Sequence, residues 1–463
     1  MRSMQGQRVT VMGLGQFGGG LGVTKWLIAQ GAHVTLTDAD QADKLEQPLA
    51  ELKPHCGAVS GTLRLALGGH HEPDFTNADV VVVNPAVRAP WTNPFVAAAQ
   101  RAGATVTSEI VLTCERIPAG VRTVAITGSV GKSTTSAMIA HAARDAAEPG
   151  RRVVFGGNIG GSILDDVTAL ATGDVLVLEL SSAMLHWLAP IAFAPDVAVI
   201  TNFSPNHLDW HGEVDHYRRS KQNLLAFLRP GATAVLGVGE VAEWPTPAGV
   251  RRAIIPAHSG IDGMLIPGRH NRWNAAVAVA SLNALGLDPS REARVIDSLR
   301  RFPGLEHRLR RVGVTERGVV AFNDSKSTTP ESTLTAVEAF ADDPGLSNVH
   351  LIAGGYDKGA DLGAVASLAP RLAGLYTLAQ TGPAIAAAAR NSLGADQRDQ
   401  GSGRVFECGT LDGAVAAALE RARPGSVLLL SPACASWGQY QNFERRGEHF
   451  VELLRTRGLK ELA

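Results

Sequence analysis

A short glycine-rich stretch carries the residues with the most evident chemical use. After an apolar run at 124–127, Gly128 and Gly131 precede Lys132 and Ser133. In a turn between a strand and a helix, backbone N–H groups and the helix N-terminus can converge on a phosphate. Lys132 could then reach a terminal phosphate, and Ser133 could hold the magnesium ion of a nucleotide. The stretch predicts a nucleotide site, but only two residues separate its glycines instead of the usual four, so an ordinary glycine turn stays the alternative.

A second glycine turn lies near the start of the chain. Residues 8–38 read as strand, turn, helix and strand, and the turn holds Gly13, Gly15 and Gly18. Asp38 follows about 20 residues later, as in the fingerprint of a dinucleotide site. The same turn suits any ligand that carries a diphosphate, so this pattern fits both NAD and a UDP-sugar.

Three further polar side chains follow apolar runs that read as buried strands, namely Asn84, Glu179 and His207. Asn84 could contact a ligand or only cap a turn. Glu179 would be costly to bury unless it is paired or bound to a metal. His207 is either structural or a ligand, and the turn residues around it favour a loop over a helix. Lys221 lies on an expected helix at 216–228 and by default faces solvent.

The last third of the chain again alternates strand and helix. Apolar runs at 319–322, 349–353, 375–380 and 427–430 each end in polar or glycine residues. Parallel strands present their carboxyl ends at one edge of a sheet, so these polar ends predict a site along that edge.

The bulk composition excludes several classes of protein. The 463 residues are 45% hydrophobic and 19% charged, and the net charge is -1, which gives no basic field for nucleic acid or an anionic membrane. Four cysteines without a CxxC pair argue against a zinc site or a disulfide framework. We find no signal-peptide core and no apolar run long enough for a membrane span, so we expect a cytoplasmic protein.

The order of these motifs predicts an α/β fold with three domains. We expect a Rossmann-like domain at 1–102 and a central P-loop ATPase-type domain at 103–304 that carries the nucleotide site. A Rossmann-like C-terminal domain would follow at 305–463. The boundaries follow a change of pattern at Gly103 and a turn at Pro303 and Gly304.

Together these stretches resemble the Mur ligase family, ATP-dependent enzymes that add amino acids to the UDP-linked peptidoglycan precursor. The short phosphate loop matches that family's Thr-Gly-x-x-Gly-Lys-Ser at 127–133. The other matching motifs are Gly-Gly-Asn-Ile-Gly at 156–160, Glu-Leu-Ser-Ser at 179–182, His-Leu-Asp-x-His-Gly at 207–212, Asn-Asp-Ser-Lys at 323–326, Gly-Gly-x-Asp-Lys at 354–358 and Ser-Pro-Ala-Cys-Ala-Ser at 431–436. With Asn-Phe-Glu-x-Arg-Gly at 442–447, the last resembles the D-glutamate-adding branch, and the Asp-Asn-Pro-Arg signature expected of diamino-acid-adding relatives is absent.

The resemblance implies roles for individual residues. The residues implied to contact ATP are Gly128, Gly131, Lys132, Ser133, Thr134, Asn274, Arg308 and Asp324. Those implied to hold two Mg²⁺ ions are Ser133, Glu179, His207 and Lys221, with Lys221 carbamylated so that a cation becomes a carboxylate-like ligand. Lys132, Glu179, His207 and Lys221 would be the catalytic set. The UDP substrate would contact Gly15, Gln16, Phe17, Thr37, Asp38, Asn84 and Asn158, and glutamate would contact Lys326, Thr328, Lys358, Ser436 and Phe443.

The implied reaction is ATP-dependent addition of D-glutamate to UDP-N-acetylmuramoyl-L-alanine through an acyl phosphate, by a monomer. An L-glutamate-adding variant, another Mur-type ligase and a folylpolyglutamate-type ligase remain alternatives, although the last needs no UDP-binding first domain. Two further alternatives are a nicotinamide oxidoreductase, which rests on the first glycine turn alone, and a non-catalytic nucleotide switch. Three departures from the family pattern are Val130 in place of Asn, Asn206 in place of Asp, and Asn84-Pro-Ala in place of Ser-Pro-Gly. The third departure lies where the family pattern contacts the sugar diphosphate.

Overall fold

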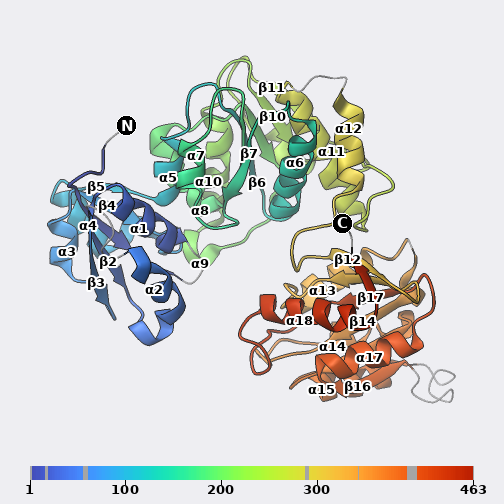
Figure 1. Cartoon of the computed structure of the whole chain (residues 1–463). Coiled ribbons are helices and arrows are strands. Elements are labelled where there is room, and N and C mark those ends of the chain that lie inside the picture. Colours follow the sequence, from blue (N-terminus) through green and yellow to red (C-terminus); the bar gives the residue numbers. More distant parts are fainter. Residues whose placement is uncertain are drawn as a thin grey trace. The chain divides into compact units, whose positions relative to one another are not determined.

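A computed structural model of the chain describes residues 3–15, 19–55, 61–286, 291–342, 344–393 and 404–461. The chain divides into two compact units (Figure 1). The first contains Met1–Ser259 and Ala275–Ser298, and the second contains Gly260–Asn274 and Leu299–Ala463. Residues 260–274 and 299–304, which the sequence analysis places in the middle domain, therefore belong to the second unit.

The first sheet of unit 1 is parallel and has the order β3-β2-β1-β4-β5. Its strands are β1 (Arg8–Met12), β2 (His33–Asp38), β3 (Thr62–Leu67), β4 (Val80–Val83) and β5 (Thr105–Thr107). The accompanying helices are α1 (Gly19–Ala29), α2 (Glu46–Leu52), α3 (Glu72–Thr76), α4 (Pro94–Arg101) and α5 (Glu109–Cys114). The strand order reverses between β1 and β4, and ligands of open α/β sheets bind at such a point.

The second sheet of unit 1 is also parallel, with the order β11-β10-β9-β6-β8-β7. Its strands are β6 (Arg122–Thr127), β7 (Val153–Gly157), β8 (Val175–Glu179), β9 (Val197–Ile200), β10 (Thr233–Leu236) and β11 (Arg251–Ile254). The helices of this segment are α6 (Lys132–Ala146), α7 (Leu164–Thr168), α8 (Ser182–Leu188), α9 (Leu208–His211), α10 (Val214–Ala226), α11 (Arg269–Ala284) and α12 (Glu292–Arg300). Here the strand order reverses between β6 and β9, and the glycine-rich turn follows β6 at this point.

The sheet of unit 2 has the order β16-β15-β14-β17-β13-β12-β18. Its strands are β12 (Arg310–Thr315), β13 (Val320–Asn323), β14 (Val349–Ala353), β15 (Gly374–Leu378), β16 (Val405–Gly409), β17 (Val427–Leu430) and β18 (Leu459–Glu461). Its helices are α13 (Pro330–Glu338), α14 (Gly363–Ala366), α15 (Gly382–Ser392), α17 (Leu411–Arg421) and α18 (Phe443–Arg455). The four expected strands, here β13, β14, β15 and β17, are mutually parallel, whereas β12 pairs antiparallel with β13 and β18.

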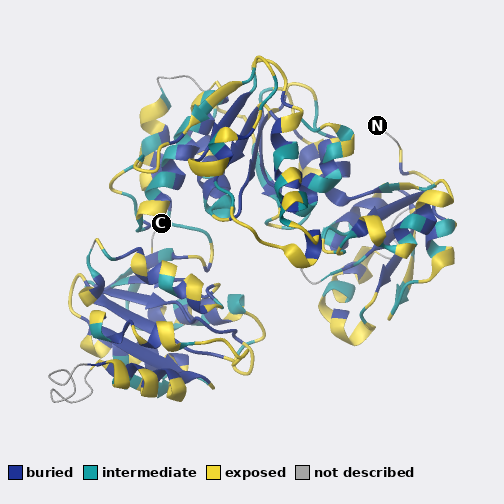
Figure 2. Cartoon of the chain, turned by 180° about the vertical axis from the view of Figure 1, so that it is seen from behind, coloured by how far each residue is buried: buried dark blue, intermediate teal, exposed yellow. Residues whose placement is uncertain are grey.

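Both faces of these sheets are covered, which explains the uninterrupted apolar runs. In β17, Leu429 packs in a core with residues of α13 and α15, and Leu428 and Leu430 pack in another with residues of α17 and α18. The first sheet likewise has one core that includes α1 residues and a second that includes α3 and α4 residues. Figure 2 shows the strands buried and the outer faces of many helices exposed.

The α/β class with three sheets confirms the expected fold, with two local differences. Strand β5 belongs to the first sheet, so this sheet extends past the boundary expected at residue 102. Around His207, where a loop was expected, the chain forms the four-residue helix α9, which ends at His211 directly before Gly212. Within the described residues, no helix combines the length and apolarity that crossing a bilayer requires.

Candidate active site

The glycine-rich turn connects β6 to α6 and has a backbone that other residues would not adopt. Gly128 has φ of 153°, and a Cβ added there would lie 1.9 Å from Thr201 Oγ1. Gly131, with φ of 82°, directly precedes α6. Lys132, the first residue of α6, folds back so that its Nζ donates to Gly128 O at 2.9 Å and Ser129 O at 3.1 Å. The lysine charge therefore lies over the turn, where a bound phosphate would need it.

The exit of the neighbouring strand β9 fixes the shape of this turn. Asn202 Oδ1 accepts from Val130 N at 3.0 Å, and Asn202 Nδ2 donates to Val130 O at the same distance. Thr201 Oγ1 donates to that carbonyl at 2.7 Å. Sequence reasoning assigned no role to either residue, although a polar pair directly after a buried strand is a signal that could have found them.

Glu179 ends β8 and is 1% exposed. Its Oε1 accepts from Asn158 Nδ2 at 3.0 Å, while its Oε2 is buried and has no hydrogen-bond partner among the described residues. A buried carboxylate oxygen without a donor is costly, and a cation would satisfy it. Oxygen donors suit Mg²⁺, which often binds through one or two carboxylates together with phosphates and water. This orphaned oxygen fits the implied metal site, and the described residues contain no cluster of three His, Cys, Asp or Glu side chains that could hold an ion unaided.

Lys221 is not the solvated lysine that its helix suggested, because it is 1% exposed. Its Nζ donates to Gly128 O at 2.8 Å and to Thr127 Oγ1 at 3.3 Å, and it lies 4.7 Å from the centre of the Tyr217 ring. Burial, and then the charge of Lys132, lower the pKa of Lys221 well below its ordinary value. The neutral amine is therefore favoured, and this is the form of lysine that reacts with electrophiles.

His207 directly precedes α9 and has a left-handed backbone, with φ of 52°. Partial burial lowers the pKa of His207, and the charges of Lys132 and Lys221 lower it further. The neutral ring that results is the form of histidine that binds metals. The structure thus brings His207 near both predicted lysines.

In the first sheet, Asp38 braces the glycine turn that was expected to bind UDP. Its Oδ2 accepts from Leu14 N at 2.8 Å and Gly15 N at 3.3 Å, and its Oδ1 accepts from Asp40 N at 2.9 Å. These three hydrogen bonds occupy acceptor positions of the Asp38 carboxylate, which in an NAD site would accept from the ribose hydroxyl groups. Gln16 and Phe17, predicted in the same turn, lie outside the described residues.

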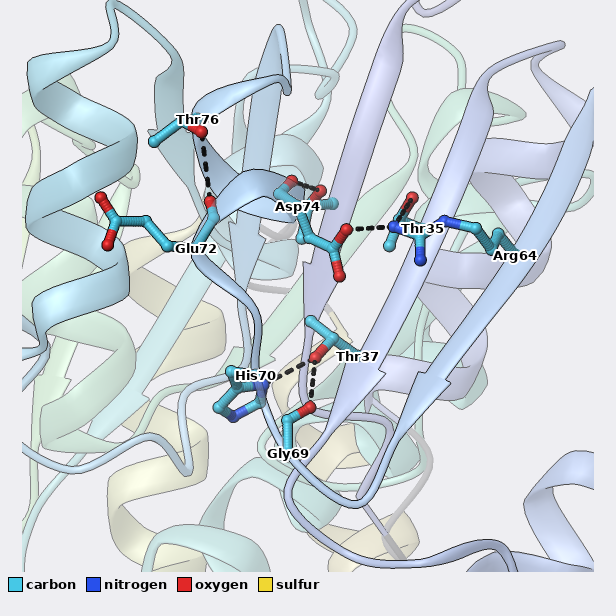
Figure 3. Close-up of polar contacts among 9 residues, drawn as sticks. Thr35, Thr37, Arg64, Gly69, His70, Glu72, Asp74 and Thr76 are labelled. Atoms are coloured by element: carbon cyan, nitrogen blue, oxygen red, sulfur yellow. Dashed lines mark hydrogen bonds and ion pairs between the residues drawn. The ribbon is translucent and has the colours of Figure 1, made fainter.

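Thr37 and Asn84 lie beside the glycine turn at Gly13 and Gly15, and both form hydrogen bonds with other groups of the protein. Thr37 Oγ1 donates to Gly69 O at 3.2 Å and lies 2.7 Å from His70 Nδ1, as Figure 3 shows. Asn84 Nδ2 donates to Gly13 O at 3.2 Å, and Asn84 Oδ1 accepts from Ala86 N at 2.9 Å, so Asn84 caps the turn that follows β4. His70 had no role in the sequence analysis, because no motif contains it.

A cavity of about 460 Å³ in unit 1 connects several of these groups. Four predicted residues border it, namely Gly15, Asn84, Asn158 and His207. Asn158 also bonds Glu179, which links the cavity to the candidate metal site. The arrangement can hold an elongated ligand with one end near the first glycine turn and the other near Glu179.

A cluster of histidine and tryptophan rings includes His186 of α8. The ring of Trp91 lies 4.4 Å from that of His216 and 5.2 Å from that of His186, and Trp210 Nε1 donates to Pro85 O at 2.9 Å. Burial and then the charge of His216 lower the pKa of His186 to about 4. The cluster therefore favours neutral rings in the folded protein.

We expect acid to destabilise unit 1 through this cluster. His186 has a folded pKa of about 4 and an unfolded pKa near 6.5, so the unfolded chain binds more protons between these values and stability falls as pH decreases through this range. Between pH 7.5 and pH 5 the Tm should fall by roughly 5 °C or more. His186→Phe should reduce that fall, whereas replacing the exposed His55 by Asn should not. An equal fall in His186→Phe would contradict the assignment.

In unit 2, Asp324 is a buried junction at the end of β13. Its Oδ1 accepts from Leu309 N at 2.9 Å, and its Oδ2 accepts from Ser327 Oγ at 2.5 Å and Ser431 Oγ at 2.7 Å. Burial raises the pKa of Asp324 to about 6. The exposed Arg308 opposes that rise through its charge, so the structure brings these two predicted ATP contacts together. Asn274 is buried on α11 in the same unit, whereas Lys132 and Ser133 belong to unit 1.

Two lysines of unit 2 each lie over an aromatic ring, near the carboxyl ends of β13 and β14, the two strands that flank β17. Lys326 Nζ is 5.2 Å from the centre of the Phe443 ring, and Lys358 Nζ is 4.1 Å from that of Trp437. Tyr356 N donates to Ala435 O at 2.9 Å, which joins the loops after β14 and β17. Ser436 is buried beside Trp437, and Thr328 is half-buried after β13. The residues predicted to bind the substrate glutamate thus lie along one edge of the sheet of unit 2. Trp437 lies among them, and the sequence analysis did not identify it.

Arg446 holds this edge together from α18. It is 1% exposed, its Nε and Nη2 donate to Ser325 Oγ at 3.0 Å and Ser325 O at 2.9 Å, and its Nη1 donates to Cys434 O at 3.0 Å. Burial lowers the pKa of Arg446 to about 10, which leaves the guanidinium charged at neutral pH. One side chain therefore fixes the loops that follow β13 and β17.

Three family models match successive parts of the chain. They are the Mur ligase MurD-like N-terminal domain at residues 7–108, the Mur ligase middle domain at 126–251 and the Mur ligase glutamate ligase domain at 307–434.

Curated relatives match over nearly the full length. A protein of Pelotomaculum thermopropionicum is 34% identical, with 97% of each chain covered. One of Anaeromyxobacter dehalogenans is 35% identical, with 97% of this chain and 98% of the relative covered. Both are named UDP-N-acetylmuramoylalanine--D-glutamate ligase.

Solved structures of similar fold include two from Thermotoga maritima. UDP-N-acetylmuramate-alanine ligase has a TM-score of 0.56 at 17% identity and covers 97% of this chain and 99% of its own. MurF ligase in complex with ADP has a TM-score of 0.56 at 17% identity, with 99% and 100% covered.

Proposed function

Because the chain belongs to the Mur ligase family, we propose that it is an ATP-dependent ligase that joins D-glutamate to UDP-N-acetylmuramoyl-L-alanine in peptidoglycan precursor synthesis. The reaction would take place in the cytoplasm, on a monomer. Family membership supports ATP as the energy source, and the turn at Gly128–Lys132 offers the backbone for its phosphates.

The pair of lysines in unit 2 is the observation that supports glutamate as the added amino acid. Lys326 and Lys358 lie at the ends of strands that flank β17, each against an aromatic ring. Two cations match the two carboxylates of a short diacid. A diamino acid would meet uncompensated like charge there, which costs several kcal/mol. The chirality follows the relatives' name, because mirror-image glutamates carry the same charges.

The chemistry requires activation of a carboxylate, since oxide is a poor leaving group. The γ-phosphoryl group of ATP moves to the alanyl carboxylate, and the amine of glutamate then attacks the acyl phosphate and releases phosphate. In this proposal, Lys132 offsets charge on the transferring phosphoryl group, and the N–H groups of the turn hold the neighbouring phosphates.

We further propose that two Mg²⁺ ions are held by Ser133, Glu179, His207 and a carbamylated Lys221. The orphaned Oε2 of Glu179 and the neutral forms favoured for His207 and Lys221 support this donor set. When bound, the ions would neutralise negative charge on the nucleotide phosphates.

One assay tests the proposed function. Phosphate release is measured with ATP, UDP-N-acetylmuramoyl-L-alanine and, in turn, D-glutamate, L-glutamate, L-lysine, diaminopimelate and L-alanine. We expect D-glutamate to react fastest, and alanine and the diamino acids to react at least 30-fold more slowly. Alanine would leave one of the two lysines without a carboxylate partner, and a diamino acid would place a positive charge beside them. Reactions without the UDP substrate correct for uncoupled hydrolysis of ATP.

Each departure from this pattern identifies a different error. Faster reaction with L-glutamate would overturn the stereochemistry, and faster reaction with a diamino acid would overturn the amino-acid assignment. Absence of phosphate release with any amino acid would contradict the ligase itself.

A further inference from the structure

Glu109 is a buried carboxyl group for which the proposed mechanism has no use. It is the first residue of α5, is 7% exposed, and borders the 460 Å³ cavity together with Asn84, Asn158 and Ser182. Burial raises the pKa of Glu109. A buried acid is costly to keep, so its position in a ligand cavity calls for an explanation.

The two carboxyl oxygens of Glu109 have different surroundings. Oε1 accepts from Ser162 Oγ at 2.8 Å and from Thr113 Oγ1 at 3.5 Å. Oε2 has no hydrogen-bond partner in the parts of the chain that the structure describes, and it is not one of the fully buried atoms. This oxygen is therefore available to a ligand in the cavity.

The position of Glu109 is fixed through Ser162, where three segments meet. Ser162 follows the loop at 156–161 that carries Asn158, and its side chain lies against α1, since a Cβ added at Gly22 would come within 2.3 Å of Ser162 Cβ. Because Ser162 is held on both sides, the carboxyl group of Glu109 has little freedom to move.

The charge of the substrate limits what can lie beside this carboxyl group. The diphosphate and the alanyl carboxylate of UDP-N-acetylmuramoyl-L-alanine are negative, so an acid in the same cavity repels both. The sugar and the amide bonds between them are neutral and carry hydroxyl and N–H donors. A carboxylate oxygen accepts from such donors with more than neutral strength.

We propose that Glu109 accepts a hydrogen bond from the neutral N-acetylmuramoyl–alanyl part of the substrate and thereby fixes which way the substrate lies in the cavity. This specificity-determining role rests on the proposed function. In this orientation the diphosphate of the substrate lies toward the glycine turn of the first sheet, and the alanyl carboxylate lies toward Glu179.

The decisive variant is Glu109→Gln, which preserves side-chain size and replaces one acceptor oxygen by a donor. We expect the KM for UDP-N-acetylmuramoyl-L-alanine to rise at least tenfold, and the KM values for ATP and glutamate to stay within twofold. Calorimetric titration of this substrate without ATP should show the same loss of affinity. UDP alone, measured as a competitive inhibitor, should bind wild type and variant equally, because it lacks the muramoyl and alanyl groups.

Glu115→Gln is the matched control, because it makes the same substitution at an exposed residue directly after α5 that does not border the cavity. We expect it to change the substrate KM less than threefold. An equal effect in the two variants, an unchanged KM in Glu109→Gln, or an equal loss of UDP affinity would each overturn the proposal. If Glu109→Gln shows no cooperative thermal transition and is therefore not folded, Glu109→Asp replaces it in the same assays. The side chain of aspartate is shorter, so its carboxylate no longer reaches the substrate. Absence of turnover in wild type would instead contradict the proposed function, so the two failures are distinguishable.

Discussion

Replacing Lys132 by alanine should reduce phosphate release by about 10³-fold or more, while the affinity for UDP-N-acetylmuramoyl-L-alanine stays within about threefold. The reason is the position of the ammonium group, which lies over the turn between β6 and α6 at 2.9 Å from Gly128 O. The cavity bordered by Gly15 and Asn84 does not include Lys132 among its lining residues. Loss of this charge should therefore affect phosphoryl transfer and leave UDP binding intact.

The measurement is a pair of assays on one preparation. Steady-state phosphate release reports turnover, and calorimetric titration with the UDP substrate reports binding. Lys44→Ala, which removes an exposed lysine of the same unit that pairs with Asp40, is the matched control and should behave as wild type. Equal loss of turnover and of UDP-substrate binding in folded Lys132→Ala would contradict this division of roles.

The apolar runs made the central strands of each sheet predictable. The run at 80–83 is β4, buried on both faces, and the runs before Gly128 and after Asp174 are β6 and β8. The edge strands were missed because they lack this signal. In β3 Leu65 is exposed, β5 has only three residues, and β7 ends in two glycines, which weaken a strand pattern.

Motif residues could be predicted as a set, but their burial could not. Lys221 lies on α10 in line with the buried Tyr217 and Leu224, four residues before it and three after it. Arg446 similarly begins a stripe on α18 that continues with Phe450 and Leu454. In each case the helical spacing placed a basic residue on the apolar face. The sequence analysis expected Lys221 to face solvent, because charge is rarely buried, and it made no prediction of burial for Arg446.

Tertiary contacts explain how both basic side chains are accommodated despite the cost of burial. Each is held by backbone carbonyls of loops from other strands, Gly128 O for Lys221 and the carbonyls of Ser325 and Cys434 for Arg446. These partners are far away in sequence, so no local pattern reveals them. A charge in an apolar helical stripe is therefore a marker for a site that the rest of the fold must complete.

Lys221→Ala should be nearly inactive, with a loss of about 10³-fold, and millimolar formate or acetate should restore part of the activity. Burial and then the charge of Lys132 lower the pKa of Lys221, which favours the neutral amine, and a neutral amine can add CO₂ to give a carbamate and a proton. The carbamate would present oxygen donors, which a Mg²⁺ site needs and a free ammonium group cannot supply. A small carboxylate could occupy the space left by alanine and provide the same oxygens.

Lys221→Arg separates this chemistry from simple loss of charge. Arginine places a basic side chain at the same position but stays protonated and forms no carbamate, so we expect this variant to be as inactive as Lys221→Ala and insensitive to formate. Removing bicarbonate and CO₂ should lower wild-type activity, and adding ¹³C-bicarbonate should restore it together with a carbamate carbon signal by NMR. Full activity of Lys221→Ala in bicarbonate-free buffer, or substantial activity of Lys221→Arg, would show that Lys221 acts as a plain lysine.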